Sequence, residues 1–192
     1  MYKKAAVLSG RTFLTSLVTD QHIFADEIDK FHFLKTLKGI LDPPGYSGIA
    51  FVLTDSELHL VLNSKADDID PDERILNGFN QVFLPYYEHR HACSGPPRVR
   101  VRAVPLFGTD QLVENSIRLH LLPRREGYVD WAADYWWSSA QMYLGHYCWD
   151  FIDQELLLST ISHDSGRARK ELTRIARKAY LQEFGKNHGY NR

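Results

Sequence analysis

Residues 48–63 read Gly-Ile-Ala-Phe-Val-Leu-Thr-Asp-Ser-Glu-Leu-His-Leu-Val-Leu-Asn, and this stretch decides the fold. Two apolar runs flank a short polar turn, which predicts a β-hairpin. Glu57 and His59 stand two positions apart in the second run, so both side chains point to the same side of the strand. They could form half of a metal site or an ordinary hydrogen-bonded pair within the sheet.

Strand and helix patterns alternate on both sides of the hairpin. The predicted elements are a strand at 12–18, a helix at 27–41, the hairpin, a helix from 71 toward 86, a strand at 98–104 and a helix from 109. Asp26, Asp70 and Thr109 are the expected N-caps, and Pro71 suits a first helical position. This order predicts an α+β fold: a ferredoxin-like antiparallel sheet with helices on one face.

The composition changes after Gly145. Residues 150–161 and 165–184 predict two further helices, the second rich in Arg and Lys, and residues 185–192 are expected to fray. We therefore expect an α+β domain over residues 1–145 and a basic C-terminal helical extension over residues 146–192.

Composition excludes several classes of protein. The chain has 192 residues, 44% of them hydrophobic, and a net charge of −1, which is typical of a globular protein without a strong overall field. No stretch is apolar and long enough to span a bilayer, and no signal-peptide core follows Met1, so we expect a cytoplasmic protein that does not enter membranes. Cys93 and Cys148 are isolated and are expected to be free thiols.

Further motifs accompany the hairpin. They are Gln21-His22-Ile23-Phe24, the run Ile-Arg-Leu-His-Leu-Leu-Pro-Arg-Arg-Glu-Gly-Tyr-Val at residues 117–129, Tyr-Trp-Trp-Ser-Ser at 135–139 and Tyr143-Leu144-Gly145. In order and spacing they resemble the HUH-type single-tyrosine transposases, most closely the repeat-associated (REP-associated) branch. The resemblance extends from residue 10 to residue 145.

The resemblance implies a DNA-processing site with three parts. In that family a His-hydrophobe-His pair binds a divalent metal, a helix tyrosine attacks the DNA, and an Asn or Gln four residues later completes the metal site. The matching residues here are Glu57 for the first His, Arg118 for the tyrosine and Leu122 for the amide, and only His59 is retained.

These departures argue for a fold that has lost its reaction. A carboxylate binds Mg²⁺ or Mn²⁺ well, so Glu57 alone does not exclude a metal. Arg118 stays protonated and cannot act as a nucleophile, and Leu122 cannot coordinate an ion. We predict no intact catalytic residue, no required cofactor and at most weak binding of Mg²⁺ or Mn²⁺ by Glu57 and His59.

Basic residues suggest where DNA would bind. Alternation along residues 98–103 places three arginines on one face of a strand, where they would meet phosphates or pair with acidic neighbours such as Asp110 and Glu114. Basic residues of the extension would contact DNA or form a solvated helix face. The candidate DNA-binding residues are Arg98, Arg100, Arg102, Arg118, Arg169, Lys170 and Arg177.

The other histidines and aromatic residues favour structural interpretations. His120 is expected to be structural, and His89 and His91 to be solvated residues at a helix end. Residues 135–137 are more consistent with packing at the edge of the sheet than with base stacking.

The leading hypothesis is a DNA-binding protein, monomeric or homodimeric, that recognises single-stranded or hairpin DNA without nicking it. One alternative is an active metal-dependent single-strand endonuclease or transposase that uses Glu57 and His59. Another is a protein-interaction module that binds no DNA.

Overall fold

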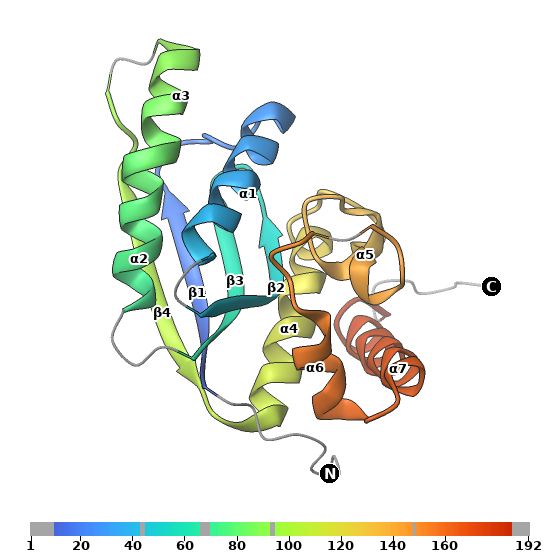
Figure 1. Ribbon diagram of the computed structural model, residues 1–192. Coiled ribbons are helices and arrows are strands. Elements are labelled where there is room, and N and C mark those ends of the chain that lie inside the picture. Colours follow the sequence, from blue (N-terminus) through green and yellow to red (C-terminus); the bar gives the residue numbers. More distant parts are fainter. Residues whose placement is uncertain (1–9, 43–44, 66–69, 93–94, 148, 186–192) are drawn as a thin grey trace, which may run out of the picture.

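The computed structural model describes residues 10–42, 45–65, 70–92, 95–147 and 149–185. Cys93 and Cys148, the two expected free thiols, lie outside this part of the chain. The strands are β1 (Arg11–Thr19), β2 (Tyr46–Leu53), β3 (Glu57–Ser64) and β4 (Val99–Leu106) (Figure 1). The helices are α1 (Glu27–Leu41), α2 (Pro71–Gly78), α3 (Leu84–His91), α4 (Gly108–Arg125), α5 (Ala140–Tyr143), α6 (Gln154–Ile161) and α7 (Ser165–Phe184).

The four strands form one antiparallel sheet in the order β2-β3-β1-β4. Strands β2 and β3 form the predicted hairpin, with Leu53 opposite Leu58 at its end. Because β1 lies between β3 and β4, the chain crosses from β1 to β2 through α1 and from β3 to β4 through α2 and α3. This arrangement confirms the predicted α+β class and the ferredoxin-like strand order.

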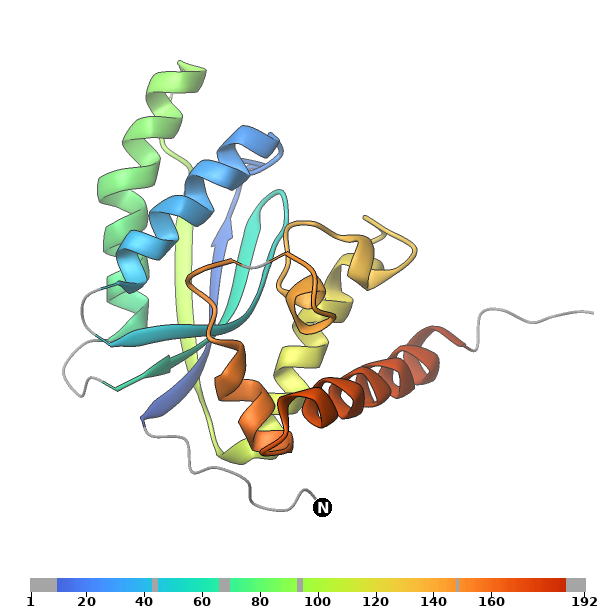
Figure 2. The ribbon, with the colours of Figure 1, turned by 45° about the vertical axis from the view of Figure 1, so that its right-hand side comes forward.

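Helices α1, α2 and α3 cover one face of the sheet. In β1 the side chains of Thr15 and Leu17 are buried on this face, whereas those of Ser16 and Val18, on the opposite face, are only partly buried. In Figure 2, α4 lies on the other side of the sheet from α1, and it contacts β2 and β3. Of the described helices only α2, on the first face, makes extensive contact with β4. Alternate side chains of β4 therefore stay exposed on the second face.

The helix that follows β3 is longer than predicted. It continues past Tyr86 to His91, and residues Phe79–Phe83 form a π-helical turn between α2 and α3. Pro85 has no N–H to donate to the preceding turn, and a wider turn just before it accommodates that loss. The turn also brings Phe79 and Phe83 into the ring cluster that includes Phe24 and Phe33.

Two distant segments cover the free edge of β2. The Leu53 N–H donates to the Trp137 carbonyl at 2.8 Å, and the Ser139 N–H donates to the Phe51 carbonyl at 3.0 Å. Further along, the Gly48 N–H donates to the Phe151 carbonyl at 3.1 Å and its carbonyl accepts from Asp153 at 2.8 Å. A Cβ at position 48 would lie 2.9 Å from that Phe151 carbonyl oxygen, so this close approach requires glycine.

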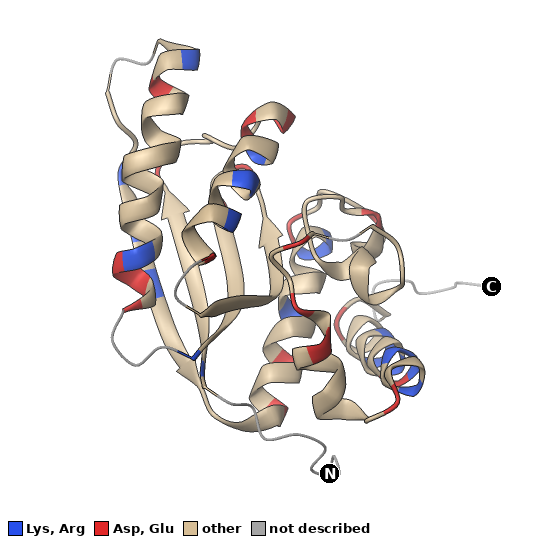
Figure 3. Ribbon diagram, viewed as in Figure 1, with Lys and Arg blue, Asp and Glu red and all other residues tan. Residues whose placement is uncertain are grey.

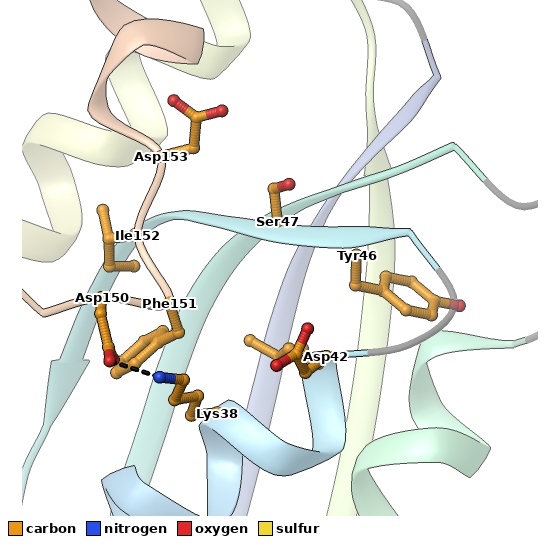
Figure 4. Close-up of a pocket in the computed structure, with 9 residues that line it drawn as sticks. Lys38, Asp42, Tyr46, Ser47, Asp150, Phe151, Ile152 and Asp153 are labelled. Atoms are coloured by element: carbon orange, nitrogen blue, oxygen red, sulfur yellow. Dashed lines mark hydrogen bonds and ion pairs between the residues drawn. The ribbon is translucent and has the colours of Figure 1, made fainter.

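The aromatic motif at residues 135–137 lies along this edge. Tyr135 and Trp137 are buried, and the Tyr135 hydroxyl donates to the Leu53 carbonyl at 2.8 Å, which confirms the packing prediction for these two residues. Trp136 remains 47% exposed. Nearby, an ion pair between Lys38 and Asp150 links α1 to the segment before α6 (Figure 4).

Two predicted helix starts are wrong. Helix α4 begins at Gly108 with Phe107 as its N-cap residue, two residues before the predicted Thr109 cap, because Gly108 adopts φ +79° and turns the chain into the helix there. Helix α6 begins at Gln154, not at residue 150, because residues 151–153 pair with β2 and Asp153 accepts from the Glu155 N–H as the cap. Helices α1 and α7 have the predicted bounds. No helix in the described residues could cross a membrane.

Asp29 joins α1 to α3. Its carboxylate is buried and accepts hydrogen bonds from the Tyr86 hydroxyl at 3.2 Å, from Arg90 and from His91 Nε2 at 2.8 Å. Arg90 also pairs with Asp26, the N-cap of α1, at 3.0 Å. His91 is exposed at the end of α3, as predicted, and its ring also bonds to this buried carboxylate.

Candidate functional site

Glu57 and His59 project from β3 onto the second face of the sheet. His59 lies opposite Ser16 of β1, and the Ser16 Oγ is 2.9 Å from His59 Nδ1. His59 Nε2 is 2.7 Å from Glu57 Oε2. With the Nε2 proton donated to the carboxylate, Nδ1 accepts the hydroxyl proton of Ser16. The three side chains therefore form one hydrogen-bonded chain, and the hydrogen-bonded alternative for Glu57 and His59 describes this geometry.

The same residues do not fit a divalent metal ion. Both ring nitrogens of His59 already have hydrogen-bond partners. One carboxylate oxygen of Glu57 bonds to that ring, so the two side chains do not direct free ligand atoms at one common position for an ion. Leu122, which the sequence resemblance matches to the third metal ligand, is partly buried and packs against the core. Within the described chain no three His, Cys, Asp or Glu side chains gather closely enough to hold a metal.

Acidic and phenolic groups from the end of α4 surround this pair. The pKa of Glu126 is raised, first by the loss of water around its carboxyl group and then by the nearby charge of Glu57. The Tyr128 hydroxyl accepts from the Asp55 N–H at 3.5 Å, and burial raises the pKa of its phenol. The raised pKa favours the protonated form of the Tyr128 phenol.

A row of arginines extends the site across the sheet. Ser16 pairs with His59 on one side and with Arg102 on the other, and Val18 lies in the same way between Glu57 and Arg100. Residues paired directly across antiparallel strands share a face, so Arg100 and Arg102 lie on the face that carries Glu57 and His59. Basic positions along β4 are blue in Figure 3.

These arginines form no ion pair in the described chain, although Asp72 of α2 lies within electrostatic range of Arg102. Arg98, Arg100 and Arg102 are exposed, and none of their guanidinium groups forms an ion pair or hydrogen bond with another described residue. The Arg98 backbone N–H, not its side chain, bonds to Asp20 at 2.8 Å. The expected alternative, pairing with Asp110 or Glu114, does not occur.

The comparisons with known proteins identify the fold. No protein-family model and no curated protein matches the chain. Among solved structures, a REP-associated tyrosine transposase bound to a REP hairpin is similar, with a TM-score of 0.56 and 13% identity, over 80% of this chain and 91% of that one. The fold is that of a REP-associated tyrosine transposase.

A second solved structure is more distant. A bacterial tRNA(His) guanylyltransferase-like protein in complex with GTP matches with a TM-score of 0.42 and 8% identity, over 66% of this chain and 72% of that one. A likeness at this level carries no argument about the site.

Arg118, which the sequence resemblance matches to the family's tyrosine, faces away from the hydrogen-bonded chain. It is 63% exposed on α4 and approaches Glu114 at 3.8 Å. It lines a groove of about 620 Å³ between α4 and α7, to which Ser16, Glu57 and His59 do not contribute. In this groove Arg125 holds Glu183 of α7 through two hydrogen bonds of 2.6 and 3.0 Å.

The basic residues of α7 divide into two groups. The Arg169 guanidinium donates to the Met142 carbonyl at 2.9 Å and to Gln154 at 2.8 Å, so it joins α7 to α5 and α6. Lys170 and Arg177 are exposed.

Ser16 and Glu126 are the residues of the site that the sequence did not reveal, because their place beside His59 depends on the strand register and on where α4 ends.

Proposed function

We propose that this protein binds single-stranded or hairpin DNA across the second face of its sheet, and that it does so without tyrosine- and metal-dependent strand transfer. The observation that carries the proposal is the pair of exposed arginines Arg100 and Arg102, which lie on the same face as Glu57 and His59 and form no ion pair in the described chain, with the exposed Arg98 directly before β4. The transposase fold supports it, because the similar solved structure is bound to a DNA hairpin.

Phosphate binding is the chemistry that such a row serves. Each guanidinium offers planar donors that suit phosphate oxygens, and alternate residues on a strand are about 6.8 Å apart, close to the spacing of successive phosphates. Each phosphate neutralised releases condensed counterions, so affinity falls as salt rises. Arg118, Lys170 and Arg177 are exposed and would extend the contact along α4 and α7.

Replacing Arg100 and Arg102 together with alanine should reduce the salt dependence of DNA binding. The slope of log affinity against log salt should flatten by about 1.4 on a single strand, about 0.7 for each contact. Fluorescence anisotropy with labelled hairpin, single-stranded and duplex DNA measures this slope. The salt concentration is varied between about 50 and about 200 mM, a range in which such slopes are resolved.

Lys35→Ala is the matched control, because this exposed lysine of α1 lies over the opposite face of the sheet. It removes one charge and should leave the slope unchanged. If the intact protein binds none of the three DNAs at low salt, the proposal fails and the interaction-module alternative gains. An equal effect of Lys35→Ala and the arginine variants would indicate nonspecific attraction instead.

Added Mn²⁺ should neither cause the protein to cleave DNA nor bind tightly to the protein. The two ring nitrogens of His59 are engaged and position 122 is apolar, so an ion would keep most of its water. Calorimetric titration should show no site tighter than roughly millimolar. A tight site that His59→Ala abolishes would instead favour the metal-dependent endonuclease.

A further inference from the structure

The hydrogen-bonded chain of Ser16, His59 and Glu57 has the order of an activated nucleophile. A hydroxyl contacts an imidazole at 2.9 Å, and a carboxylate holds the other ring nitrogen at 2.7 Å. An imidazole held in this way accepts a proton from the hydroxyl while the carboxylate stabilises the charge that develops. Such a catalytic triad is recognised by its geometry and by the role of each group, not by the order of the residues in the chain.

A second serine–histidine pair in the same protein shows what a structural pair looks like. His120 Nε2 lies 2.8 Å from the Ser139 Oγ, but both residues are buried and the Ser139 Oγ also accepts from the Phe51 N–H at 2.9 Å. Ser16 has no such backbone bond among the described residues; its Oγ contacts only His59, on a partly open face. Its hydroxyl is therefore not engaged in holding the fold together.

The residue on the other side of Ser16 completes the arrangement. Arg102 is its direct partner on β4, is exposed and forms no ion pair in the described chain, so its side chain shares the face of the Ser16 hydroxyl on the side opposite to β3. A phosphate bound by Arg102 would lie beside the Ser16 Oγ. The guanidinium would also stabilise the negative charge that develops on the phosphoryl oxygens during attack.

We propose that Ser16 is a nucleophile toward a phosphodiester, with His59 as general base, Glu57 as the residue that orients His59, and Arg102 as the phosphate-binding cation. This inference rests on the proposed DNA binding, and it requires no metal ion. Phosphodiesters are the substrate class because Arg102, the strand partner of Ser16, offers a guanidinium group for a phosphate on the same face of the sheet.

The step balances without a further reagent. The Ser16 Oγ forms a bond to phosphorus while its proton passes to His59 Nδ1, and the bond from phosphorus to one sugar oxygen breaks. That oxygen takes the proton back from the imidazolium and leaves as a free hydroxyl on one DNA end. The other end stays joined to the protein as a phosphoserine diester, which water or a DNA hydroxyl can then displace.

The test traps this covalent intermediate. Single-stranded and hairpin oligonucleotides with a bridging sulfur in place of either the 3′ or the 5′ sugar oxygen are incubated with the full chain in EDTA. The thiol that leaves attacks phosphorus poorly, so an adduct accumulates. We expect a protein–DNA adduct on a denaturing gel and a nucleotide mass on the peptide that contains Ser16.

Variants separate this chemistry from folding and from binding. Ser16→Ala should abolish the adduct, and His59→Gln should slow its formation by about a hundredfold or more; the DNA affinity of each variant is measured separately, so that a loss of adduct is compared at equal occupancy. Ser56→Ala, which removes a hydroxyl in the neighbouring turn, should form the adduct at the normal rate. Thermal unfolding checks that each variant is folded.

Each other outcome has one meaning. DNA binding without an adduct overturns the Ser16 proposal and leaves the proposed function standing. An adduct that survives in Ser16→Ala assigns the nucleophile to another residue and also overturns it. Absence of DNA binding by the intact protein at low salt overturns the proposed function itself.

Discussion

Replacing Asp29 with alanine is expected to lower the free energy of unfolding by about 3 kcal/mol. Its carboxylate is 2% exposed and accepts from Tyr86, Arg90 and His91, which hold α3 against α1. Removal of one partner of a buried ion pair costs about 3–5 kcal/mol, and the lower end applies because Arg90 and His91 retain contact with water. Urea unfolding monitored by tryptophan fluorescence measures the change.

Glu27→Ala provides the control for this variant. Glu27 is an exposed acid in the same first turn of α1, so its loss should change stability by about 0.5 kcal/mol or less. Similar losses in the two variants would show that the carboxylate acts only through the helix dipole. The buried network around Asp29 would then contribute little to stability.

His120 is expected to make the fold sensitive to mild acid. Burial lowers the pKa of its imidazole to about 4, from 6.5 for an exposed group. Between these two pH values the unfolded chain binds a proton that the folded chain does not, and stability falls as pH falls wherever the unfolded state binds more protons. This difference in proton binding corresponds to about 3 kcal/mol of the free energy of unfolding, which is lost as pH drops from about 6.5 to about 4.

The His120→Gln variant isolates this contribution. Glutamine cannot titrate, yet it can still bond to the Ser139 hydroxyl, so the variant should lose stability less steeply than the native protein over this range. The exposed His22→Gln serves as the control and should follow the native curve. Urea unfolding at a series of pH values gives both curves; parallel curves for the native protein and His120→Gln would rule out the linkage.

Local signals explain which parts of the fold could be predicted. Asp26 and Asp70 each accept a hydrogen bond from a first-turn N–H, and the helices start where these caps predict. Thr109 failed as a predicted cap because Gly108 takes a positive φ that composition does not reveal. The pairing of residues 151–153 with β2 also escaped prediction, because it joins segments far apart in the chain.

The residues of the site also divide into those that local sequence patterns predict and those that depend on distant strand pairing. The two-residue period of a strand was enough to place Glu57 beside His59, and the alternation of β4 was enough to place its arginines on one face. That Ser16 lies between His59 and Arg102 depends on how β1 pairs with two neighbours at once. No residue within β1 carries that information, so the chain of hydrogen bonds became visible only in three dimensions.

The covering of the β2 edge has a consequence for how the chain matures as it is synthesised. All four strands are present once residue 106 has been made, yet the hydrogen-bonding groups of Gly48 wait for Phe151 and Asp153. Until then β2 offers an open edge to which another nascent chain can add. Expression should therefore be most vulnerable to aggregation while the ribosome translates the intervening stretch, and a chain ended at Gly145 would keep the part of that edge around Gly48 open permanently.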